Sequence, residues 1–108
     1  MDKERLQAEK ALDYLSKTDQ EVVQLERVYK DLEQAYKEIK AAIVQTSEGA
    51  QDVRKAIAET HEEAKKAWVK MQDAWQAWRN MVMRRDSAVR RWEDWRSLNS
   101  ARRQGQVI

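Results

Sequence analysis

The sequence predicts an all-α protein built as a long antiparallel helical hairpin of the coiled-coil kind. The 108 residues include no proline and two glycines. An average domain has about 5% proline and about 7% glycine, so residues that end helices are nearly missing. Between Asp2 and Arg103 the single glycine is Gly49. On both sides of it apolar residues recur in steps of three and four, as on a helix that packs against another helix.

The first arm of the hairpin is expected to cover residues 2–46. Thr18 followed by Glu21 has the form of a capping box, so residues 16–20 are a candidate break. Either a short helix precedes a long one there, or one helix has a local kink. The apolar seam of this arm consists of Ala8, Ala11, Leu15, Thr18, Val22, Leu25, Tyr29, Leu32, Tyr36, Ile39 and Ile43.

The turn is expected at residues 47–51, where Gly49 can adopt the left-handed conformation that ends a helix. Ser47 or Asp52 can cap the helix that follows. The second arm is expected over residues 52–102 with a candidate break at residues 84–87. The tail, residues 103–108, is basic, loses the apolar stripe and is expected to fray. The seam of the second arm consists of Ile57, His61, Ala64, Trp68, Met71, Trp75, Trp78, Val82, Arg85, Val89 and Trp92.

Each arm carries a second apolar seam beside the first, and this doubling bears on assembly. A two-helix hairpin buries one seam per helix and leaves the other in water, together with several of the five tryptophans. We therefore expect a homodimer in which two hairpins form a four-helix bundle, with a monomeric three-helix bundle as the alternative. The residues expected in the core or the self-association surface are Leu25, Leu32, Tyr36, Ile39, Trp68, Met71, Trp75, Trp78 and Trp92.

The formal net charge of +2 conceals a strong asymmetry along the chain. Residues 1–64 contain 10 Lys/Arg and 15 Asp/Glu, whereas residues 65–108 contain 11 and 4. Two arms of opposite sign attract each other along their edges, which favours one pairing over others. A cationic arm can also attract an acidic partner such as nucleic acid.

Arginine and tryptophan are interleaved in the last third of the chain. Arginine binds phosphate bidentately and tryptophan stacks on unpaired bases, so this segment is a candidate surface for nucleic acid or another acidic partner. The alternative is that the tryptophans are core and the arginines line its rim. Trp95 lies off the first seam and is the indole most readily assigned to a partner. The candidate partner-binding residues are Arg84, Arg90, Arg91, Trp95, Arg96, Arg102 and Arg103.

Residue patterns typical of enzymes are missing from the sequence. There is no cysteine and one histidine, His61, so neither a thiolate site nor a two-histidine metal site can form. No nucleophile lies beside a general base and no glycine-rich loop could cradle phosphate. We expect no catalytic activity, no cofactor, no metal and no small-molecule substrate. No apolar run approaches the roughly 18 residues that cross a bilayer, so a cytoplasmic location without membrane contact is expected.

Both ends of the chain resemble a family of small, largely uncharacterised helical proteins of tailed phages. The residues that carry the resemblance are Tyr14-Leu15-Ser16-Lys17-Thr18-Asp19-Gln20-Glu21 and Trp95-Arg96-Ser97-Leu98-Asn99-Ser100-Ala101-Arg102-Arg103-Gln104-Gly105. The middle of the chain departs from the pattern. The resemblance implies a phage or prophage accessory protein whose gene lies near recombination or replication genes. It implies no catalytic residue.

Two functions of different classes follow as expectations. The first is a nucleic-acid-binding accessory module in which the basic arm follows phosphates. The second is a protein-binding inhibitor or adaptor that acts on a host defence or repair complex, with the arginine-rich face in an acidic groove of the target.

Overall fold

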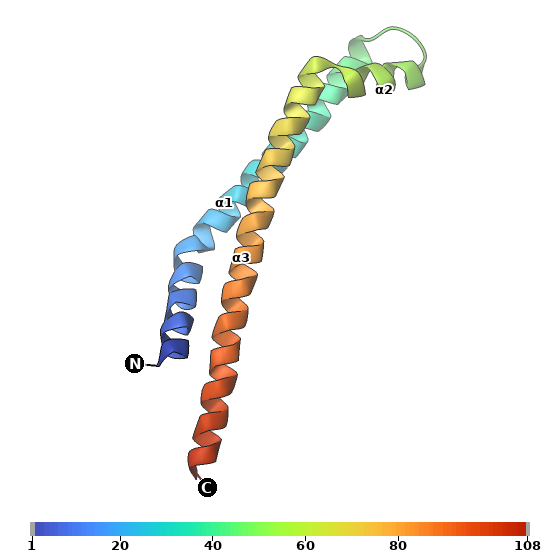
Figure 1. Ribbon diagram of the computed structural model, residues 1–108. Coiled ribbons are helices and arrows are strands. Elements are labelled where there is room, and N and C mark those ends of the chain that lie inside the picture. The colour runs from blue at the N-terminus through green and yellow to red at the C-terminus, as the bar shows by residue number, and fades with distance from the viewer. Residues whose placement is uncertain (1, 108) are drawn as a thin grey trace. The chain divides into compact units, whose positions relative to one another are not determined.

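The computed structural model describes residues 2–107, and over that range it is all-helical, without strands (Figure 1). Three helices follow one another, α1 (Lys3–Thr46), α2 (Gln51–Thr60) and α3 (Glu62–Val107). The predicted all-α class is confirmed. The chain divides into two compact units. Unit 1 consists of Met1–Val22 and Asn80–Ile108, and unit 2 consists of Val23–Arg79.

Helix α1 is continuous, so the alternative of a short helix followed by a long one at residues 16–20 is wrong, and one helix with a local kink stays a prediction. Thr18 lies in the helix interior instead of at an N-cap. Its side chain is buried and its hydroxyl donates to the Tyr14 carbonyl at 2.7 Å. A threonine hydroxyl that bonds back to the preceding turn is satisfied without ending the helix, which explains why the capping-box pattern does not start a new one.

The turn between α1 and α2 depends on Gly49. Its φ of +110° lies in the region that favours glycine. The Arg54 guanidinium donates to the Gly49 carbonyl at 2.8 Å and closes the turn. The expected capping by Ser47 or Asp52 is wrong: the N-cap is Ala50, which makes no side-chain cap bond. The Ser47 hydroxyl instead donates back to the Ile43 carbonyl at 2.6 Å.

The second arm is interrupted at His61, between α2 and α3, and not at residues 84–87. His61 has extended backbone angles, φ −67° and ψ 138°, and its Nδ1 accepts the Glu63 N–H at 3.2 Å. His61 therefore acts as a cap for α3 and is exposed, so its expected place in the seam is wrong. Glu62 in the first turn adds a favourable charge at the N-terminus.

Helix α3 continues through residues 84–87 and on to Val107. The expected break at residues 84–87 is therefore wrong. The fraying expected for the tail, residues 103–108, stays a prediction. Ile108, the last residue of that tail, lies outside the described range.

In unit 1 the α1 and α3 segments run antiparallel and meet through small residues. Ala8, Ala11 and Ala88 are each 3% exposed or less. Alanine at a contact lets two helix backbones approach closely, because the interaxial distance depends on the side chains between them. The Tyr14 hydroxyl donates to the Met81 sulfur at 3.3 Å. This unit is thus held by close backbone approach and a few long-range polar contacts.

In unit 2 the α1 and α3 segments also pair antiparallel, here through larger rings. Tyr29 and Trp78 stack with their ring centroids 5.6 Å apart and an interplanar angle of 18°. Offset stacking of this kind adds roughly 0.5–1.5 kcal/mol beyond the area buried. Ala58 of α2 and Ala64 and Met71 of α3 are buried in this unit.

The residues predicted for the core or the self-association surface differ in how far they are buried. Met71 is buried, and the half-buried members are Leu25, Leu32, Tyr36, Ile39, Trp78 and Trp92. Trp68 and Trp75 are instead 47% and 40% exposed. One copy of the chain therefore leaves two of its indoles partly exposed to water.

Candidate functional site

The α3 segment of unit 1 carries the strongest excess of charge in the chain. Residues 80–108 contain seven arginines and three acidic residues. Residues 23–79, by contrast, contain ten cations and ten acids, so unit 2 is neutral overall. The candidate site is therefore built from the arginines of this one helical segment and from the aromatic side chains between them.

Two of the seven arginines are bound to α1 and help to hold unit 1 together. The Arg85 guanidinium donates to the Leu15 carbonyl at 2.9 Å and to the Thr18 hydroxyl at 2.7 Å, and it pairs with the Asp19 carboxylate. Arg102 donates to Asp2 at 3.0 Å and to Glu4 at 3.2 Å. Arg102 was predicted to bind a partner, but its guanidinium is already neutralised within the unit.

The other five arginines are exposed, and none has an ion pair with a carboxylate in residues 2–107. They are Arg84, Arg90, Arg91, Arg96 and Arg103. Arg90 donates to the Ser87 hydroxyl at 3.5 Å and Arg91 to the Ser87 carbonyl at 3.4 Å. Several cations of α1 differ in this respect, because Arg5, Lys17, Lys30 and Lys37 each pair with an acid four residues away. Five guanidinium groups are therefore free to bind an anion.

The structure does not gather these five arginines on a single face. Residues seven apart lie two turns apart on the same side of a helix, so Arg84 lies in line with Arg91 and Arg96 with Arg103. Arg91 lines a groove with Glu4 and Gln7 of α1. Arg103 lines a different groove, and the arginines thus surround α3 instead of forming one patch.

Trp95 is half-buried and stacks on Trp92 with the ring centroids 5.4 Å apart and an interplanar angle of 26°. It was predicted to bind a partner, and Trp92 to be core, yet the two indoles form one pair. Trp95 lines the groove of Arg103 as well as the groove of Arg91. The pair therefore has Arg103 and Arg5 in one adjoining groove and Arg91 in the other.

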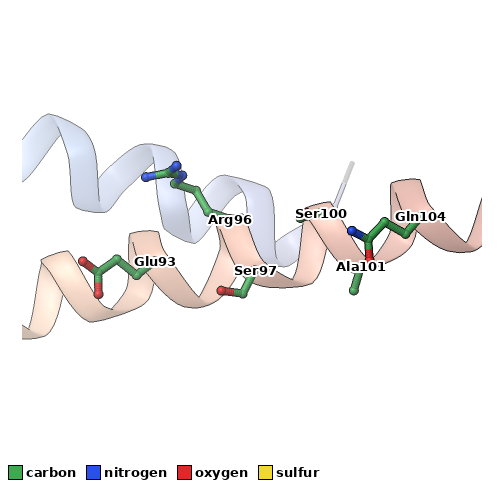
Figure 2. A pocket seen from close by; sticks show the side chains of 6 residues that line it. All are labelled: Glu93, Arg96, Ser97, Ser100, Ala101 and Gln104. Atoms are coloured by element: carbon green, nitrogen blue, oxygen red, sulfur yellow. The ribbon is translucent and has the colours of Figure 1, made fainter.

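Arg96 borders a shallow hollow on the outer side of α3. Figure 2 shows its six lining side chains, all of them on successive turns of that helix, among them Glu93, Ser97 and Gln104. A hollow made by one helix has no opposing wall, so it cannot enclose a ligand. Arg96 is best regarded as an exposed cation.

Sequence reasoning missed Asn99 and Arg5, which line the groove of Arg103 together with both indoles. A signal for Asn99 was present, since it lies seven residues after Trp92 and four after Trp95, on the same side of a helix. Arg5 could not be placed there, because its approach depends on the pairing of α1 with α3.

The described residues contain no group of three or more His, Cys, Asp or Glu side chains that could hold a metal ion. Nor does any helix in residues 2–107 combine the length and apolar character required to span a bilayer. Comparisons with protein-family models, curated proteins and solved structures found no match to this chain.

Proposed function

We propose that this chain is a non-enzymatic phage accessory protein that binds nucleic acid through the α3 segment of unit 1. The site of action is the bacterial cytoplasm, in a recombination or replication context. The observation that supports the proposal is the set of five exposed arginines without a carboxylate partner. Each can form a bidentate, charge-assisted pair with phosphate.

The arrangement of the arginines favours nucleic acid over an acidic protein groove. Arg90 and Arg91 are neighbours on a helix and so point about 100° apart. A rigid groove can contact only one side of α3 at a time. A flexible polyanion can reach several sides, and every phosphate contact releases bound counterions.

The experiment compares two variants with the same loss of charge. In the first, Arg84, Arg90, Arg91, Arg96 and Arg103 are replaced by Gln. In the control, five cations of unit 2 are replaced by Gln, namely Lys30, Lys37, Lys55, Lys65 and Lys70. Binding of a fluorescein-labelled DNA is followed by anisotropy at low salt. Each lost phosphate contact should weaken binding by roughly a factor of three or more, so the first variant should bind at least about 100-fold more weakly than wild type. The affinity of the control should stay close to that of wild type. Equal losses in both variants would contradict the proposal.

Self-association belongs to the same proposal and is supported by Trp68 and Trp75. These exposed indoles lie seven residues apart, on one side of α3, and Val69 beside them is 50% exposed. Covering this stripe with a second copy removes apolar area from water at about 25 cal/mol per Å². Two hairpins joined in this way would form the four-helix bundle expected from the doubled seams.

Sedimentation equilibrium at micromolar concentration tests the stripe. Wild type should be dimeric, and the double variant Trp68→Gln, Trp75→Gln should be monomeric with unchanged helicity. The matched control is Val53→Gln, a residue of α2 that is 48% exposed. It should remain dimeric. A monomeric wild type would overturn this part of the proposal.

A protein-binding inhibitor or adaptor, aimed at a host defence or repair complex, is the second candidate. It is favoured by Leu98, an exposed side chain that lines a groove beside Arg91 and Trp95. Arginine and tryptophan are enriched in binding hot spots, and Leu98 adds exposed apolar surface beside them. Pull-down from nuclease-treated host lysate separates the two functions, because a protein partner stays bound and partners bridged by nucleic acid are lost. The variant Leu98→Gln should release a protein partner only.

A further inference from the structure

Unit 1 contains a groove between the N-terminal turns of α1 and the C-terminal turns of α3. Its volume is about 550 Å³, within the range of small-molecule sites. The stacked indoles Trp92 and Trp95 line it from α3, as do Asn99 and Arg103. Arg5 and Glu9 line it from α1, and Asp2 lines it from just before that helix. Aromatic, amide and guanidinium groups therefore meet in one open depression.

We propose that this groove holds an unpaired base of a single-stranded nucleic acid, with Trp92 and Trp95 as the stacking surface. The inference rests on the proposed nucleic-acid binding and identifies the class of strand. Each indole covers one face of the other, and both are only half-buried, so aromatic surface remains in contact with water. Every base has a flat face that can extend such a stack.

The charges around the groove suit a phosphate beside the base. Asp2 is paired with Arg102 at 3.0 Å, and Glu9 with Arg5 at 3.2 Å. Both carboxylates are thus neutralised by guanidinium groups. Arg103 remains as the surplus cation at the groove, because within residues 2–107 it pairs with no acid. Two carboxylates and two guanidinium groups line the groove, so its formal charge is zero, and Arg103 is the lining cation without a carboxylate partner.

Asn99 supplies the polar group that a base edge requires. It is half-buried, it lines the groove, and within the described part of the chain its amide makes no hydrogen bond. An amide offers one acceptor and two donors, which match the donor and acceptor pattern of an adenine edge.

A duplex cannot use this site in the same way. Its bases are stacked on one another and paired, and taking one out costs a few kcal/mol. The groove therefore predicts that the protein prefers single strands, whereas the exposed arginines bind phosphates of either form. Strand preference is a property of the indole pair, separate from charge.

The test measures the affinity of labelled 12-nucleotide oligo(dA) and of a 12-base-pair duplex for wild type and Trp95→Leu. Wild type should bind the single strand more tightly. Trp95→Leu should weaken single-strand binding by roughly 5- to 100-fold, the loss of one stacked base, and change duplex binding by less than about 2-fold. Trp95→Phe, which keeps an aromatic face, should restore most of the affinity. Val53→Leu, at an exposed residue of unit 2, is the control and should bind as wild type does.

Thermal unfolding followed by circular dichroism shows whether Trp95→Leu is folded. If it is not, Asn99→Leu on the exposed side of the same groove gives a second test. It should reduce the preference for oligo(dA) over oligo(dT). If the protein binds both nucleic acids tightly and substitutions at Trp95 and Asn99 leave both affinities unchanged, this inference is overturned. The proposed function would still stand in that case. A wild type that binds neither nucleic acid would overturn both.

Discussion

Arg85 of α3 and Thr18 of α1 are joined by a hydrogen bond of 2.7 Å across unit 1. Thr18 is buried, and its hydroxyl accepts from Arg85 while donating to the Tyr14 carbonyl. The same guanidinium also binds the Leu15 carbonyl and the Asp19 carboxylate. Arg85, a cation in the seam of the second arm, thus binds three partners on α1 and fixes the register of the two helices.

Replacing Arg85 with Gln should lower the free energy of unfolding by about 1–3 kcal/mol, because the shorter amide cannot satisfy the groups that Arg85 now binds. Urea denaturation followed by circular dichroism measures the change. The neighbouring Arg84→Gln is the control, and it should stay within about 0.5 kcal/mol of wild type because Arg84 is exposed. If Arg85→Gln lowered the free energy of unfolding less than Arg84→Gln does, the bonds from Arg85 to α1 would not be what holds unit 1 together.

Ala88 is fully buried, with 0% exposure, at the contact of α3 with α1 in unit 1. Substitution by Leu should destabilise the protein by about 1–3 kcal/mol, since the added carbons force the two helices apart. Ala101 on the same helix is exposed, so Ala101→Leu should be nearly neutral. Thermal unfolding of both variants measures the difference. Equal stability of the two would mean that the helices do not approach each other at Ala88.

Acid should weaken the fold through two carboxyl groups. The hydrogen bond from the Tyr29 hydroxyl at 2.7 Å, with help from Lys37, lowers the pKa of Glu33. Hydrogen bonds with Glu4 and with the Arg102 guanidinium lower the pKa of Asp2. A carboxyl whose pKa is lower in the folded state contributes stability above its ordinary pKa, and this contribution is lost as the pH falls through the folded value.

The melting temperature should therefore fall between about pH 5 and about pH 2.5. Tyr29→Phe keeps the ring that stacks on Trp78 but removes the hydrogen bond to Glu33. Its melting temperature should depend less on pH over this interval than that of wild type. Tyr36→Phe is the control and should retain the wild-type dependence. A Tyr29→Phe profile that matches wild type would show that this bond does not stabilise the folded state.

Helical periodicity predicted the fold class and the position of the turn, because steps of three and four and the nearly complete absence of glycine and proline are local signals. The helix breaks were predicted less well. Thr18 and Glu21 match a capping box, yet tertiary burial of Thr18 keeps the helix intact. The second arm is interrupted at His61, where the sequence has neither glycine nor proline. The imidazole of His61 caps α3 there.

The candidate site was predictable in composition but not in arrangement. The excess of arginine after residue 80 is visible in the sequence. Which arginines remain free depends on α1, because Asp2 and Glu4 reach Arg102 and leave Arg103 without an acid. Trp95 was expected to bind a partner alone, whereas its spacing of three from Trp92 makes the two indoles a stack. The stack of the indoles is a local contact, whereas the pairing of Arg102 depends on a contact between distant parts of the chain.

The salt dependence of single-stranded DNA binding tests the central claim most directly. If the five free arginines contact phosphates, a plot of log affinity against log salt concentration should be linear with a slope of about −2 to −3.5. Replacement of all five by Gln should bring that slope close to zero. Binding with a slope near zero in wild type, or no binding at low salt and micromolar protein, would contradict the account.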